Sequence, residues 1–179
     1  MSSRSRASSS LTVAAPAFPG SRVAELQRAV AESLRANGFR LRFVPLHRLP
    51  ESALLAGRAD APQLEWSRRV LAGSGAVVLI TPCHEAPVSR LAQAWLELVP
   101  PGERPVHPVC LGATRAQQAG ADYAVRRLLE RRGVRRVAPV RFVHERSFAA
   151  TGSGWRLDPA AVPDLAELRR EPVPQVPAA

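Results

Sequence analysis

The run Ala-Val-Val-Leu-Ile at residues 76–80 constrains the fold more than any other stretch of this sequence. Five consecutive apolar residues predict a strand buried on both faces, the usual state of a central strand in a parallel sheet. Thr81 and Pro82 end the run, because proline cannot donate to a strand ladder. The sequence Cys-His-Glu at residues 83–85 follows. It should stand at the carboxyl edge of the sheet, where open α/β sheets bind ligands.

Strands and helices alternate along the rest of the chain. Four further strands are predicted, at residues 11–15, 40–45, 106–111 and 137–143. Helices are predicted after Ser21, at 63–71, at 91–99, through 121–129 and at 163–170, with a flexible loop at 151–154. This alternation implies a parallel sheet with right-handed crossovers. We expect a three-layer α/β sandwich with the flavodoxin-like strand order 2-1-3-4-5.

Length and composition indicate one domain without a membrane span. The 179 residues suit a single core, which we place at 11–171, between a Ser/Arg-rich tail at 1–10 and a Pro-rich tail at 172–179. The basic start lacks the apolar stretch of a signal peptide. Only two cysteines are present, which favours a reducing compartment and hence the cytoplasm.

The formal net charge of +10 raises the question of nucleic-acid binding. All 25 basic residues are arginine, with no lysine, as a GC-rich genome would encode them. Aromatic residues make up only 5% of the chain and do not interleave with the arginines for base stacking. We therefore expect the arginines to form a solvated surface and regard nucleic acid as an improbable partner.

The predicted strand order brings three loops together at one crevice. They follow the strands at 11–15, 76–81 and 106–111. In the second loop, Cys83 and His84 could suggest a nucleophile and its base. Adjacent side chains do not naturally point at each other, and no Gly-x-Cys-x-Gly elbow is present, so an ordinary loop cysteine is favoured. The four histidines lack the spacing of metal ligands, and no metal site is predicted.

Residues at these loops resemble those of the NADPH-dependent FMN reductases, most closely the type that supplies reduced flavin to two-component sulfonate monooxygenases. The matching residues occur in the same order in this chain as in the family. They are Pro16, Phe18, Ser21 and Arg22 at the phosphate loop, then Thr81, Pro82, Ala86 and Ser89, then Gly112, then Asp122-Tyr123-Ala124. The likeness covers about residues 11–148.

The resemblance implies a flavodoxin-like enzyme that uses NADPH or NADH to reduce FMN for a partner monooxygenase. The cofactor-binding residues that it implies are Pro16, Phe18, Ser21, Arg22, Thr81, Pro82, Cys83, His84, Glu85, Ser89, Gly112 and Ala113. Backbone N–H groups around 82–85 and 112–113 would bind the flavin ring. The resemblance also implies a homodimer or homotetramer that pairs across the helix at 91–99, with Trp95 in the contact.

The first loop departs from the family pattern. Family members typically read Gly-Ser-x-Arg followed by a run of serines, which bind the FMN phosphate at a helix N-terminus. This chain has Ala14-Ala15-Pro16-Ala17 there, and Ser21 alone remains of the serine run. The alternative hypothesis is therefore a flavodoxin-like domain that has lost efficient flavin binding. Such a domain would act as a partner-binding subunit or catalyse a different reaction in the same crevice.

Overall fold

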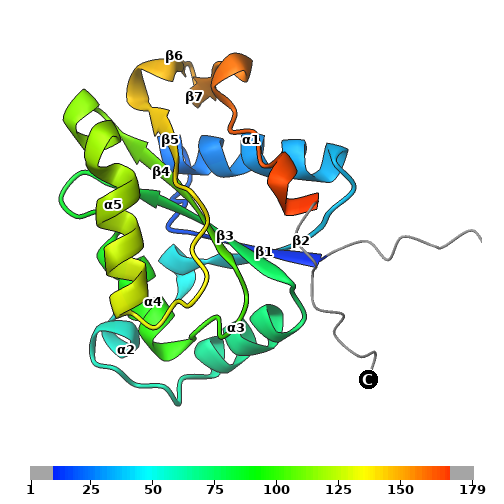
Figure 1. The fold of residues 1–179 in the computed structure, drawn as a ribbon, viewed down its shortest axis with the longest axis vertical. Helices are drawn as coiled ribbons and strands as arrows, with labels where there is room; N and C mark the ends of the chain where they lie inside the picture. Colours follow the sequence, from blue (N-terminus) through cyan, green and yellow to red (C-terminus); the bar gives the residue numbers. More distant parts are fainter. Residues whose placement is uncertain (1–9, 170–179) are drawn as a thin grey trace, which may run out of the picture.

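The computed structural model describes residues 10–169. The predicted tails lie outside this range, except that Ser10 begins the first strand. The main sheet consists of β1 (Ser10–Ala15), β2 (Arg40–Pro45), β3 (Ala76–Pro82), β4 (Val106–Gly112) and β5 (Arg141–His144). All neighbouring pairs are parallel, and their order is β2-β1-β3-β4-β5 (Figure 1). The predicted fold and strand order are confirmed.

The central strand has the environment that its composition predicts. Residues 76–80 of β3 are at most 1% exposed, with β1 on one side and β4 on the other. Alternate residues face opposite layers, so Val77 and Leu79 join one apolar cluster while Val78 and Ile80 join the other.

Helices cover both faces of the sheet. Residues of α2 (Glu51–Leu55), α3 (Pro62–Ala72), α4 (Arg90–Leu98) and α5 (Arg115–Arg131) contribute to the core on one face. Helix α1 (Arg22–Ala36) contributes to the core on the other face, together with the C-terminal segment (Figure 1). The sandwich therefore has three layers, as predicted.

The C-terminal part differs from the prediction. The supposed flexible loop at 151–154 belongs to an antiparallel hairpin of β6 (Phe148–Thr151) and β7 (Gly154–Leu157). Of the helix expected at 163–170, the described residues up to 169 form only the short 3-10 turn Ala166–Arg169, and another 3-10 turn lies before it at Pro159–Ala161. Apolar residues of this part, among them Leu157 and Leu165, pack on the α1 side of the core.

Two further expectations about secondary structure are wrong. The fifth strand begins at Arg141 rather than at residue 137, and Val137 forms only an isolated bridge to Val106. Pro139 interrupts the predicted strand, because it has no N–H for the ladder. The short helix α2 was not predicted, since its five residues are too few to show a helical period.

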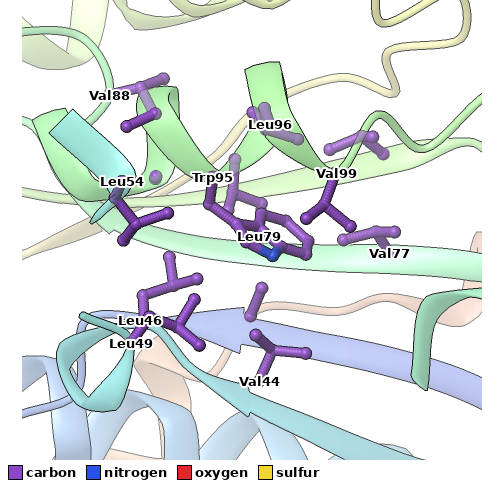
Figure 2. Close-up of a cluster of buried hydrophobic side chains, with 14 of the residues drawn as sticks. Val44, Leu46, Leu49, Leu54, Val77, Leu79, Val88, Trp95, Leu96 and Val99 are labelled. Carbon is purple, nitrogen blue, oxygen red and sulfur yellow. The ribbon is translucent and has the colours of Figure 1, made fainter. Parts of the chain in front are cut away.

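The predicted subunit contact requires Trp95 to lie on the surface, but Trp95 lies in the interior. It is fully buried, and its indole N–H donates to Ser67 Oγ at 2.7 Å. Figure 2 shows it within the apolar cluster that includes Leu79 and Val99. The helical spacing identified an apolar face correctly, but this face packs against the protein's own sheet. The oligomeric state stays a prediction that no longer rests on Trp95.

Candidate functional site

Three loops meet at the carboxyl edge of the sheet, where β1, β3 and β4 end side by side. The strands β3 and β4 pair up to the last residue of β3, with Pro82 beside Leu111. The Cys83 N–H donates to the Leu111 carbonyl at 2.9 Å, which extends the pairing into the second loop. The loops after β3 and β4 are therefore held against each other.

Thr81 and Ser89 shape the loop between β3 and α4. The Thr81 hydroxyl is fully buried, accepts from the Ser89 N–H at 2.8 Å and donates to the Pro82 carbonyl at 3.1 Å. Ser89 is the N-cap of α4, its Oγ accepting from the Ala92 N–H at 3.4 Å. Both predicted site residues thus close the loop at its two ends, and both hydroxyls make hydrogen bonds within the protein.

Cys83 is a structural thiol at this edge. Its side chain is buried and donates to the Leu111 carbonyl at 3.2 Å. Burial raises the pKa of the Cys83 thiol. Burial also raises the pKa of the Cys110 thiol, and the neighbouring Cys83 adds a smaller increase. Because the thiolate is the reactive form of cysteine, neither residue has the environment of a nucleophile.

The loop after β4 is held by Gln117, which the sequence analysis did not single out. Gln117 Oε1 accepts from the Ala113 N–H at 2.8 Å and the Thr114 N–H at 3.0 Å, and its Nε2 donates to the Cys83 carbonyl at 3.1 Å. The Ala113 N–H is thus paired within the protein, and its expected role as a donor to flavin stays a prediction. The capping-box pattern Thr114-x-x-Gln117 was the signal that could have identified this residue.

Gly112 is enclosed by protein atoms. An added Cβ would stand 2.6 Å from Phe142 Cζ and 2.8 Å from Cys83 Sγ. The protein interior alone therefore requires glycine at this position.

The loop after β1 presents one exposed aromatic side chain. Pro16 is buried, whereas Phe18 is 53% exposed, and the Phe18 ring lies 5.1 Å from the His47 ring. Burial, and to a smaller extent the charge of Arg48, lowers the pKa of His47. The Phe18 and His47 rings thus form an aromatic edge beside the exposed Arg48.

Ser21 and Arg22, the predicted phosphate ligands, both have partners within the protein. Ser21 is the N-cap of α1, and its Oγ accepts from the Ala24 N–H at 3.1 Å. The Arg22 guanidinium stacks over the Trp155 ring at 3.7 Å, and Arg22 Nη1 lies 3.6 Å from Glu145 Oε2. Glu145 Oε1 in turn lies 3.0 Å from His84 Nε2. We call Arg22, His84, Glu145 and Trp155 the Glu145 cluster.

The β6–β7 hairpin fixes this cluster beside the first loop. A Cβ on Gly154 would lie 3.8 Å from the Gly20 carbonyl oxygen, and the Leu157 N–H donates to Glu25 Oε1 at 3.0 Å. Hydrogen bonds from Arg28 and then from Leu157 lower the pKa of Glu25 against the opposing effect of burial. The sequence analysis did not identify Glu145 or Trp155 as site residues. It interpreted the segment after the fifth strand as a loop and a helix, and that pattern does not show where the segment packs.

A pocket of about 260 Å³ opens beside the second loop, between that loop and α5. Its lining includes His84 and Glu85 from the loop and Gln117, Gly120 and Ala124 from α5. Glu85, a predicted site residue, is exposed here. Within residues 10–169 no group of three or more His, Cys, Asp or Glu residues could hold a metal ion, and no helix is long and apolar enough to span a membrane.

The fold and the arrangement of the three loops define a flavodoxin-like α/β protein, and comparison with solved structures agrees. The apo form of an NADH:FMN oxidoreductase, EMOB, matches with a TM-score of 0.64 and 24% identity over 75% of each chain. An oxidoreductase from Corynebacterium diphtheriae matches with a TM-score of 0.61 and 20% identity, covering 82% of this chain and 87% of the other. A cysteine-to-serine mutant of flavodoxin from Pseudomonas aeruginosa matches with a TM-score of 0.55 and 17% identity, over 90% and 97%.

These likenesses establish the fold. No protein-family model matches the sequence, and no curated protein matches it.

Proposed function

We propose that this protein is an NAD(P)H-dependent flavin reductase that binds FMN in the crevice between the loops after β1, β3 and β4. More specifically, the protein would be a cytoplasmic homo-oligomer that supplies reduced FMN to a partner monooxygenase. The family resemblance of residues 11–148 supports it, as do the names of two solved structures with this fold, an NADH:FMN oxidoreductase and an NAD(P)H:quinone oxidoreductase.

The backbone of the second loop carries this proposal. Within residues 10–169, the N–H groups of His84, Glu85 and Ala86 make no hydrogen bond. The loop that presents them is fixed at both ends by Thr81 and Ser89 and linked to β4 through Cys83. Unpaired donors on a fixed backbone suit the carbonyl and nitrogen acceptors at the edge of a flavin ring. The ring part of FMN therefore fits the residues present.

The residues would act by binding and orienting the reactants. Flavin, when bound, would supply the hydride-transfer chemistry. The N–H groups of residues 84–86 would hold the ring edge, and Phe18 would border the ring on the β1 side. For the phosphate, Arg22 and the first N–H groups of α1 would be the ligands.

A flavin titration tests the proposal. FMN fluorescence should be quenched by micromolar protein, and NADPH or NADH should be oxidised only when protein and FMN are both present. Riboflavin serves as the comparison, because it has the same ring without the phosphate. If neither flavin is quenched at high micromolar protein, the crevice is not a flavin site.

A second candidate function is a flavodoxin-like domain that no longer binds flavin efficiently and serves another role in the same fold. The observation in its favour is that Ser21 and Arg22 are already engaged, by Ala24 and by Glu145 with Trp155. Absence of quenching in the titration would favour this second candidate.

A further inference from the structure

Glu145 places a carboxylate beside the residues that would receive a phosphate. It stands between Arg22 at the start of α1 and His84 in the second loop, and its side chain is 23% exposed. The remaining partner of Arg22 is the neutral Trp155 ring, which fixes the direction of the guanidinium without neutralising it. Glu145 thus places a negative charge directly between Arg22 and His84.

The contact between Arg22 and Glu145 leaves the guanidinium only partly satisfied. The closest approach is 3.6 Å, longer than a charge-assisted hydrogen bond of about 2.7–2.9 Å. Arg22 Nε is buried and has no hydrogen-bond partner among the described residues. A phosphate could pair with this cation better than Glu145 does, but it would first meet the repulsion of the carboxylate.

We propose that Glu145 is an internal anion that competes with the 5′-phosphate of FMN for Arg22 and so determines flavin specificity. This inference rests on the proposed function, because it assumes that the flavin ring occupies the crevice. Glu145 would lower the affinity for phosphorylated flavin and leave the affinity for the ring unchanged. FMN would then bind as a substrate that exchanges, which suits a protein that passes reduced flavin to a partner.

The test compares two flavins on two charge-removing variants. Glu145→Gln keeps the size of the side chain and removes its charge. Glu32→Gln is the matched control, because Glu32 lies on the exposed side of α1, where it pairs with Arg28, outside the Glu145 cluster. FMN and riboflavin are titrated into the wild type and both variants by fluorescence quenching at low ionic strength, where charge effects are least screened.

Glu145→Gln should bind FMN about ten- to a hundredfold more tightly than the wild type, the range expected for one charge-assisted hydrogen bond. Riboflavin affinity should be equal in all three proteins, and Glu32→Gln should bind both flavins like the wild type. Unchanged riboflavin binding also shows that the variant's crevice is intact.

Three results would overturn the inference while leaving the proposed function in place. FMN affinity could stay the same or fall in Glu145→Gln, both flavins could tighten equally, or Glu32→Gln could tighten FMN as much as Glu145→Gln does. Loss of riboflavin binding in Glu145→Gln alone would also overturn it, because Glu145 would then support the ring. If no flavin binds to any of the proteins, the proposed function itself is wrong, and the inference fails with it.

Discussion

Replacing Gly112 with alanine separates two reasons for a glycine at this position. Glycine at a binding loop can allow a ligand to approach the backbone closely. In the structure, the space that a Cβ would need is taken by Phe142 and Cys83. The first reason predicts a defect only in flavin binding, whereas the second predicts a defect in the stability of the flavin-free protein.

The distances set the size of the expected effect. The new Cβ would lie 2.6 Å from Phe142 Cζ, whereas ordinary contacts begin near 3.4 Å, so the ring must retreat by about 0.8 Å. Cys83 Sγ, at 2.8 Å and held by its bond to the Leu111 carbonyl, limits movement on the other side. Overpacking of this kind costs about 1–3 kcal/mol. For a chain of this length, 2 kcal/mol lowers Tm by roughly 4–8 °C.

The assay is urea unfolding of the flavin-free protein, followed by circular dichroism, with Gly120→Ala as the control. A Cβ on Gly120 meets nothing within 4 Å, and the residue lies inside α5, where alanine is favoured over glycine by about 0.5–1 kcal/mol. The two substitutions should therefore change the free energy of unfolding in opposite directions. If Gly112→Ala leaves that free energy unchanged, the packing argument is refuted and close approach of a ligand becomes the better explanation.

Two further outcomes concern ionisable groups. The lowered pKa of Glu25 stabilises the folded protein at pH values above the ordinary pKa of about 4.5, and this stabilisation disappears as pH falls through the lower folded pKa. Glu25→Gln should therefore lower the free energy of unfolding by about 1 kcal/mol at neutral pH and leave it unchanged at strongly acidic pH. Urea unfolding at each pH measures both values. Burial raises the pKa of Cys83 and Cys110. Both thiols should therefore react with an aromatic disulfide reagent at mildly alkaline pH only after unfolding. A fast reaction in the native protein would contradict their burial.

The sheet could be predicted because its signals are local. The apolar run at 76–80 identified a central strand, and regular alternation with helices then left few topologies to consider. The start of α1 after Ser21 was also predictable, since capping depends on neighbouring residues. Trp95 was misplaced because spacing shows that a helix has an apolar face without showing what covers it.

The site was less predictable because its contacts are distant in sequence. The chain positions of Thr81, Ser89 and Gly112 were identified, yet their roles as loop anchors and a packing position depend on bonds and contacts that no motif displays. Glu145 and Trp155 were missed altogether, since they reach Arg22 from a segment more than a hundred residues away. In this segment, the two residues Gly152 and Ser153 between two short strands were a hairpin signal that the loop interpretation overlooked.

The contact between Leu157 and Glu25 also governs when the crevice is completed during synthesis. Its two residues are separated by 132 positions, so Glu25 leaves the ribosome long before its partner exists. The early strands and α1 can assemble first, because domains form from the N-terminal side as the chain emerges. Glu145 and the hairpin with Trp155 are synthesised last and close the start of α1. A nascent chain can therefore form β1 to β4 and α1 before the hairpin exists, and a chain that terminates ahead of residue 157 lacks the donor to Glu25.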